Sequence, residues 1–132
     1  MKIFFLFIWT LSLFAESWSV VYVSSELGLS TKDLKNIYYK KMRQKKGVSL
    51  IALNLPSSHP ARKAFLQQIL ASNLHMWDLY YDEMYFMGVK TPPVLESPEM
   101  MVKFLFKIEG AVGYIPSSQV NKKFIELAKF EL

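Results

Sequence analysis

The pattern of apolar and polar positions predicts an α/β fold, and it is clearest in the middle of the chain. Residues 48–53 form a short apolar, β-branched run, which is typical of a buried strand. A polar turn at residues 54–60 follows, and then residues 61–71 repeat apolar side chains at helical spacing. The predicted buried face of this helix consists of Phe65, Leu66, Ile69 and Leu70. The sequence therefore predicts a strand that leads through a tight turn into a helix.

The turn has the residues of a helix start and of an anion site. Either Ser58 or His59 can cap the helix, and Pro60 suits the first turn, where a missing N–H costs no hydrogen bond. Backbone N–H groups and serine hydroxyls meet at such a point, and the helix dipole favours a negative charge there. The candidate anion-binding residues are Ser57, Ser58 and Arg62. The alternative is a capped junction between strand and helix without a ligand.

The remaining elements continue the alternation of strands and helices. A capping-box pattern at residues 30–33 predicts a helix over residues 31–43. Two further helices are expected, one between Asn73 and Gly88 and one between Ser97 and Gly110. Other strands are predicted at residues 18–23, 111–115 and 123–130. The last segment is compatible with a helix or a strand, and its short apolar helical face favours the strand.

The helix that ends near Gly88 carries many aromatic side chains. Trp77, Tyr80, Tyr81, Met84 and Tyr85 form a broad stripe at helical spacing. Such a stripe forms a core face in most helices, and the alternative is a surface that stacks on a ligand or partner.

The N-terminal segment has the pattern of a secretory signal peptide. Lys2 precedes an apolar run at residues 3–14, and a small residue, Ala15, precedes the acidic Glu16. The run is shorter than the roughly 20 apolar residues that span a bilayer. We therefore predict a signal peptide at residues 1–15, one mature domain at residues 16–132 and a periplasmic location. The alternative is an uncleaved membrane anchor.

Composition narrows the possible functions. The chain has no cysteine, which excludes disulfides and thiol catalysis. Its net charge is +5, and seven basic residues cluster early in the chain: Lys32, Lys35, Lys40, Lys41, Arg43, Lys45 and Lys46. Such a cluster attracts acidic ligands, anionic lipid or nucleic acid, or it is a solvated surface. Export argues against nucleic acid as the natural partner.

Signatures of catalysis are missing from the sequence. His59 and His75 lack further ligands at zinc-binding spacing, and the acids Asp78, Asp82 and Glu83 are typical of a solvated helix face. The chain contains no G-x-S-x-G turn, Walker loop or dinucleotide fingerprint. We therefore expect a protein that is not an enzyme and that uses neither a metal nor a cofactor.

Three stretches together resemble the periplasmic phosphate-binding proteins of ABC importers. Residues 29–39 (LSTKDLKNIYY) are similar to the family's L-S-x-x-[DE]-L-x-x-I-[FY] helix, and residues 54–65 (NLPSSHPARKAF) are similar to its serine-bearing turn and helix. The third stretch resembles the family's downstream F-x-G…P-P and G-A-[IV]-G-Y segments. It consists of Phe86-x-Gly88 with Pro92-Pro93, followed by Gly110-Ala-Val-Gly-Tyr-Ile-Pro116. The resemblance implies a single three-layer lobe of the type 2 periplasmic-binding-protein kind, with a mixed sheet flanked by helices.

The resemblance also implies a function and shows where this chain departs from the family. Asn54 stands where full-length members have arginine, and Ser58-His59-Pro60 replaces a Ser-Gly-Thr anion loop. The resemblance implies a non-catalytic solute-binding protein, with weak binding of phosphate or another oxyanion, linked to a membrane transporter or sensor. The alternative is a periplasmic interaction module that has kept the fold and lost the ligand site.

Overall fold

The computed structural model describes residues 16–132, and the predicted signal peptide at residues 1–15 lies outside the described residues. Four strands form a mixed sheet in the order β4-β5-β1-β6. Their bounds are β1 Ser17–Tyr22, β4 Ile51–Ala52, β5 Ala111–Pro116 and β6 Ile125–Glu131. β5 and β6 pair with β1 in antiparallel orientation, whereas β4 pairs with β5 in parallel. The predicted α/β class and the C-terminal strand are confirmed.

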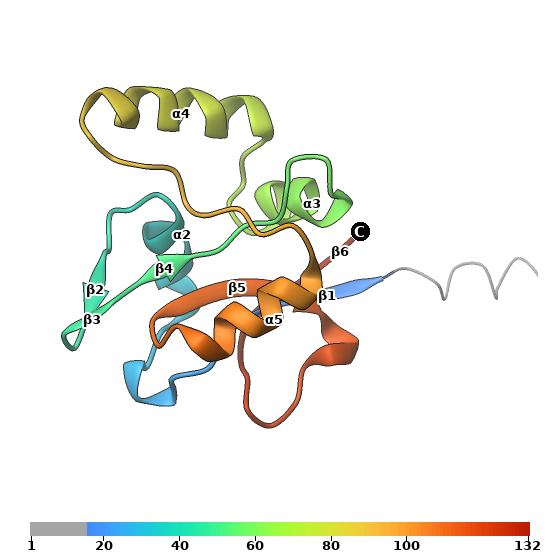
Figure 1. Ribbon diagram of the computed structural model, residues 1–132. Helices are drawn as coiled ribbons and strands as arrows, with labels where there is room; N and C mark the ends of the chain where they lie inside the picture. Colours follow the sequence, from blue (N-terminus) through green and yellow to red (C-terminus); the bar gives the residue numbers. More distant parts are fainter. Residues whose placement is uncertain (1–15) are drawn as a thin grey trace, which may run out of the picture.

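Helices cover both faces of this sheet (Figure 1). Their bounds are α2 Thr31–Tyr38, α3 Pro60–Gln68, α4 Leu74–Phe86 and α5 Pro98–Lys107. Neighbouring residues of β5 show the two faces, because successive side chains of a strand point in opposite directions. Gly113 lies against Met101 of α5, whereas the ring of Tyr114 stacks on Phe65 of α3 at 4.3 Å between centroids. The lobe therefore has three layers, as predicted, with α5 on one side and α3 on the other.

Side-chain caps set the starts of three helices. His59 Nδ1 accepts a hydrogen bond from the N–H of Ala61, which resolves the alternative between Ser58 and His59 as the cap of α3. Asn73 Oδ1 caps α4 and Ser97 Oγ caps α5, each by accepting from the N–H three residues later. These local hydrogen bonds satisfy donors that the first helical turn leaves free.

The predicted helix over residues 31–43 is too long. α2 ends at Tyr38, and Lys40 adopts a left-handed conformation with φ 56°. The N–H of Lys41 donates to Asn36 O and the N–H of Lys40 to Ile37 O, which is the Schellman pattern of a helix end. The hydrogen bonds of this turn stop the helix without glycine.

The predicted strand at residues 48–53 is divided in two. Val48–Ser49 is β3, which pairs with β2 (Gln44–Lys45) in a separate hairpin, and only Ile51–Ala52 joins the main sheet as β4. Lys46 and Gly47 make the two-residue turn of the hairpin, both at positive φ. Positive φ at both central positions gives a turn whose twist matches that of the strands.

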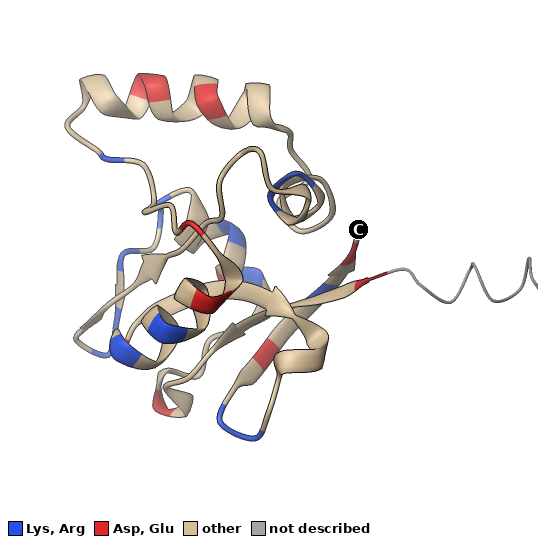
Figure 2. Cartoon of the chain, turned by 45° about the vertical axis from the view of Figure 1, so that its right-hand side comes forward, with Lys and Arg blue, Asp and Glu red and all other residues tan. Residues whose placement is uncertain are grey.

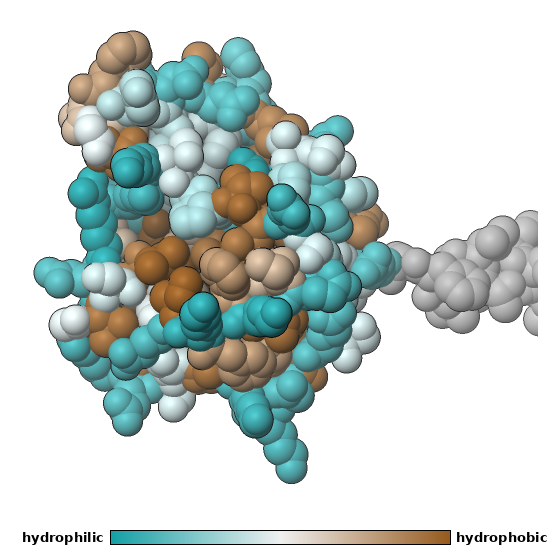
Figure 3. Space-filling model, viewed as in Figure 1, coloured by the Kyte–Doolittle hydropathy of each residue, from teal (hydrophilic) through white to brown (hydrophobic). Residues whose placement is uncertain are grey.

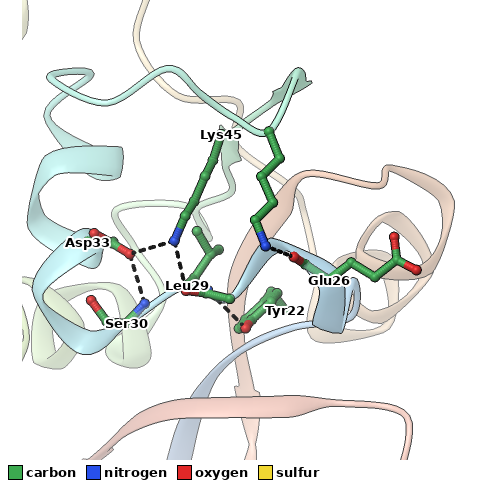
Figure 4. A network of polar contacts seen from close by, with 8 residues as sticks. Tyr22, Glu26, Leu29, Ser30, Asp33 and Lys45 are labelled. Carbon is green, nitrogen blue, oxygen red and sulfur yellow. Dashed lines mark hydrogen bonds and ion pairs between the residues drawn. The ribbon is translucent and has the colours of Figure 1, made fainter.

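The hairpin is fastened to the loop that precedes α2 (Figure 4). Lys45 Nζ lies 3.9 Å from a carboxylate oxygen of Asp33 and donates to the backbone carbonyl of Gly28 at 2.8 Å. Lys46 Nζ donates to Glu26 O at 2.7 Å, and the N–H of Ser30 donates to Asp33 Oδ2 at 2.8 Å. Part of the basic cluster thus has a structural role.

The aromatic stripe of α4 is only partly a core face. Trp77 and Tyr81 are buried, whereas Tyr85 is 73% exposed. The hydroxyls of Tyr80 and Tyr81 donate to the backbone carbonyls of Tyr39 and Tyr38 at the end of α2. These contacts hold α4 against the end of α2 and leave its outer side open to solvent (Figure 1).

Two glycines of the Gly-Ala-Val-Gly-Tyr segment sit where a side chain does not fit. A Cβ on Gly110 would lie 1.9 Å from the backbone oxygen of Ser49, and a Cβ on Gly113 would lie 2.5 Å from the sulfur of Met101. Real Cβ atoms do not approach other atoms so closely. The segment therefore lets β5 pass close to the hairpin on one side and to α5 on the other.

Within residues 16–132, no helix combines the length and apolar character that crossing a membrane requires, and no cluster of histidine or acidic side chains could hold a metal ion.

Candidate functional site

The turn between β4 and α3 is held at the edge of the sheet by backbone hydrogen bonds. The N–H of Asn54 donates to Pro93 O at 3.0 Å, and Asn54 O accepts from the N–H of Leu95 at 2.7 Å. Asn54 and Val94 form a parallel bridge that extends the sheet beyond β4. The segment before α5 therefore fixes the start of the turn.

Tyr114 of β5 holds the same turn by hydrogen bonds from its hydroxyl. Its hydroxyl accepts from the N–H of Leu55 at 3.0 Å and donates to Asn54 Oδ1 at 3.1 Å. Asn54 and Tyr114 are both buried. Burial raises the pKa of the Tyr114 phenol, and the Leu55 N–H and the Arg62 cation lower it by smaller amounts. A neutral phenol can serve as donor and acceptor at once, so it supports both partners.

Replacing Tyr114 by phenylalanine is expected to destabilise the fold by about 1–3 kcal/mol, because the buried Leu55 N–H and the Asn54 amide oxygen would each lose their hydrogen bond to the hydroxyl. Urea unfolding at neutral pH measures this change. An unchanged midpoint would show that the hydroxyl does not hold the turn.

The same tyrosine gives stability a dependence on alkaline pH. Burial raises the folded-state pKa of Tyr38 and Tyr114 above the ordinary value of 10.0, so the folded protein keeps these protons after the unfolded chain has lost them. Their stabilisation is complete below pH 10 and falls by up to about 1.4 kcal/mol per phenol for each pH unit above it. The loss between pH 8 and pH 11 should be smaller in Tyr114→Phe than in the wild type. An equal loss would assign the alkaline sensitivity to other groups.

The two predicted serines lie at the surface of the turn. Ser57 and Ser58 are exposed, and within residues 16–132 neither hydroxyl makes a hydrogen bond. His59 is partly buried, with its ring 5.5 Å from that of Trp18 in an edge-on arrangement. Pro60 has no N–H, and the N–H of Ala61 is already bound to His59. The free donors of this turn are therefore those of the serines rather than those of the first helical turn.

The side chain of Arg62 is buried and contacts the backbone of the turn. It is only 5% exposed, Nη1 donates to Leu55 O at 2.7 Å, and the guanidinium carbon lies 5.5 Å from the centre of the Trp77 ring. Its Nε has no hydrogen-bond partner, and Arg62 forms no ion pair with any residue in the described part of the chain. The structure thus places an uncompensated positive charge under the turn.

Sequence reasoning identified the turn and its three candidate residues but missed the support. In the sequence, Asn54 stands out only as a departure from the family pattern, and Tyr114 only as part of the Gly-Ala-Val-Gly-Tyr motif. The signal in the sequence is an asparagine directly after one predicted strand and a tyrosine within another, since the two side chains can form a hydrogen bond. Sixty residues separate the two, so sequence spacing could not show that they bond.

The fold can be compared with solved structures. A protein from Clostridium perfringens, described as a phosphate ABC transporter substrate-binding protein with bound phosphate, matches with a TM-score of 0.66 and 12% identity. An ABC-type phosphate transport receptor from Vibrio cholerae matches with a TM-score of 0.61 and 16% identity. Each match covers 86% of this chain. No protein-family model and no curated protein matches the sequence.

The matched region is less than half of either solved chain, 44% of the first and 46% of the second. The arrangement of a mixed sheet with helices on both faces is shared over that region. The fold is therefore that of a single lobe similar to those of phosphate ABC transporter substrate-binding proteins.

Proposed function

We propose that the protein is an exported, non-catalytic solute-binding protein linked to transport or sensing. It binds phosphate or another oxyanion weakly at the turn before α3. The observation that carries the proposal is the exposed Ser57-Ser58 turn above the buried, unpaired Arg62, in a fold shared with a substrate-binding protein that holds phosphate.

The chemistry of the turn suits an oxyanion. The hydroxyls of Ser57 and Ser58 are free to donate, and the start of α3 adds the positive end of a helix dipole. The buried Arg62 raises the electrostatic potential at the turn through low-dielectric surroundings, and it polarises Leu55 O at the same time. Arg62 therefore acts on an anion by charge rather than by direct contact.

The proposed affinity is low. A few hydrogen bonds, each worth roughly 0.5–1.5 kcal/mol or up to about 3 when charged, sum to a micromolar-to-millimolar dissociation constant. Substitution of the Ser-Gly-Thr loop by Ser58-His59-Pro60 removes the glycine that lets backbone approach a ligand closely. A single lobe also leaves a ligand open to water on one side.

Calorimetric titration with phosphate and sulfate tests the proposal. We expect weak binding by the wild type, loss of most of it in Ser58→Ala and retention in Ser25→Ala, which removes the hydroxyl of another exposed serine, on the short helix at Ser25–Leu27. Binding that Ser58→Ala leaves intact would move the site away from this turn. The absence of binding by either anion at millimolar concentration would reject the proposal.

That last outcome would favour the second candidate, an interaction module. The observation behind it is the outer face of α4, where Met76, Leu79 and Phe86 are exposed around Asp82 and Glu83. Figure 2 shows that acidic residues lie along this helix. Exposed apolar side chains beside acids suit a partner protein with apolar and basic groups, such as a membrane transporter or sensor.

The proposal includes export. N-terminal sequencing of the protein recovered from the cell envelope is expected to begin at or near Glu16, because Ala15-Glu16 has the pattern of a cleavage site. Recovery of intact Met1 in a membrane fraction would contradict both the cleavage and the domain boundary.

A further inference from the structure

A concave site lies between the end of α2, strand β4 and the segment that follows α4. Its volume is about 480 Å³, which falls within the usual range for small-molecule sites. Much of its lining is apolar, and these residues are called its apolar floor here: Ile37, Met42, Leu50, Ile51, Val89 and Pro93. Figure 3 shows apolar residues at the surface of one face of the molecule, next to hydrophilic ones.

Three cations surround this groove, and all its charged lining residues are positive. Lys40 follows α2, Arg43 lies just before β2, and Lys90 belongs to the segment after α4. None of the three forms an ion pair within residues 16–132, where the ion pairs are Lys45 with Asp33 and Lys129 with Glu126. Burial lowers the pKa of Lys40, and the nearby charges of Arg43 and Lys90 lower it further. Like charges are thus held together without a compensating acid.

Hydrogen bonds to the backbone hold the turn that carries Lys40 and Arg43. The left-handed conformation of Lys40 ends α2 beside the groove, and Arg43 Nε donates to Lys40 O at 3.1 Å. Tyr39 directly precedes Lys40, and its carbonyl accepts a hydrogen bond from the hydroxyl of Tyr80. Helix α4 therefore supports the turn that follows α2. An arrangement that gathers repelling charges over an apolar floor is complementary to a molecule with a negative head and a hydrocarbon body.

We propose that this groove binds a small amphipathic carboxylate, with its head among Lys40, Arg43 and Lys90 and its hydrocarbon on the apolar floor. The site is separate from the turn at Ser57 and Ser58, because it lies beside β4 and the end of α2, whereas that turn leads out of the sheet into α3. The proposal is therefore independent of phosphate binding.

Octanoate is a suitable probe, followed by NMR of the methyl groups of Met42, Leu50 and Ile51. We expect saturable shifts of these methyl signals with octanoate, much weaker shifts with acetate, which lacks the tail, and weaker shifts with octylammonium, which reverses the charge. Raising the salt concentration should weaken octanoate binding, because exposed charge pairs are screened.

Variants test the role of the cations. Lys90→Gln and Lys40→Asn should each weaken octanoate binding about two- to fivefold, the effect of losing an exposed ion pair. Asparagine is chosen at position 40 because it tolerates positive φ. Lys103→Gln, at an exposed position of α5 away from the groove, should leave binding unchanged. Lys90 is exposed in a loop, so its variant remains informative if Lys40→Asn folds poorly.

Several outcomes would overturn the proposal. These are no methyl shifts at millimolar octanoate, equal binding of octylammonium, or octanoate affinity that Lys90→Gln reduces no more than Lys103→Gln does.

Discussion

Replacing Phe65 by alanine is expected to lower the free energy of unfolding by about 3–5 kcal/mol. Phe65 is fully buried between the sheet and the helices. Its ring stacks on Tyr114 with 4.3 Å between centroids, lies 4.7 Å from Tyr38 and meets Phe130 edge-on at 5.8 Å. Truncation would remove all three aromatic contacts and leave a cavity that these large neighbours cannot close.

Urea unfolding of the purified variant measures the effect, with the slope of the transition compared as well as its midpoint. Phe86→Ala is the matched control, because Phe86 is 88% exposed and its loss should change stability by no more than about 0.5 kcal/mol. A Phe65→Ala midpoint close to that of the control would show that α3 does not pack on the sheet as described.

Local signals in the sequence predicted most of the helix starts and strands. The caps at Asn73 and Ser97 and the proline after Ser97 act over three or four residues, so they operate independently of the rest of the fold. The C-terminal strand was predictable because its apolar helical face was too short, and the structure pairs it with β1. Helix caps and apolar faces involve only residues of one segment, so the sequence alone can predict them.

The end of α2 and the hairpin after it were not predictable in the same way. The charged stretch from Lys40 to Lys46 continues a helical pattern, yet Lys40 turns left-handed and Lys46 enters a hairpin turn. Bonds from the distant Tyr80 and Tyr81 to the end of α2, and from Lys45 and Lys46 to the loop before it, contribute to this arrangement. Tertiary contacts override helix propensity here.

The sequence predicts the turn that carries the candidate residues, but it does not predict the side chains that support this turn. Strand, turn and capped helix placed Ser57 and Ser58 at the surface. The burial of Arg62 depends on Trp77 of another helix, and the support of the turn depends on Tyr114 of another strand. Such partners are set by the topology, which the order of elements along one sequence does not specify. The cationic groove is not predictable from the sequence for the same reason, because Lys90 is far from Lys40 along the chain.

The second large effect is expected at Gly110, where alanine should destabilise the fold by at least about 3 kcal/mol. The added Cβ would lie 1.9 Å from the backbone oxygen of Ser49 and 2.8 Å from its carbonyl carbon. Neither atom can move alone, since Ile51, two residues later, donates its N–H to Gly110 O at 2.9 Å and begins β4. Relief of the clash would therefore separate β4 from β5.

Gly113→Ala is the control that distinguishes a backbone clash from a crowded side chain. Its Cβ would meet the sulfur of Met101 at 2.5 Å, but a methionine side chain can change rotamer, so the cost should stay near 1–2 kcal/mol. Urea unfolding of both variants gives the comparison. If Gly110→Ala proved no more destabilising than Gly113→Ala, the close approach between residue 110 and Ser49 of β3 would be wrong. Greater destabilisation by Gly110→Ala, together with weaker hydrogen-exchange protection of the Ile51 and Leu53 amides, would confirm that glycine at this position allows β4 to join the sheet.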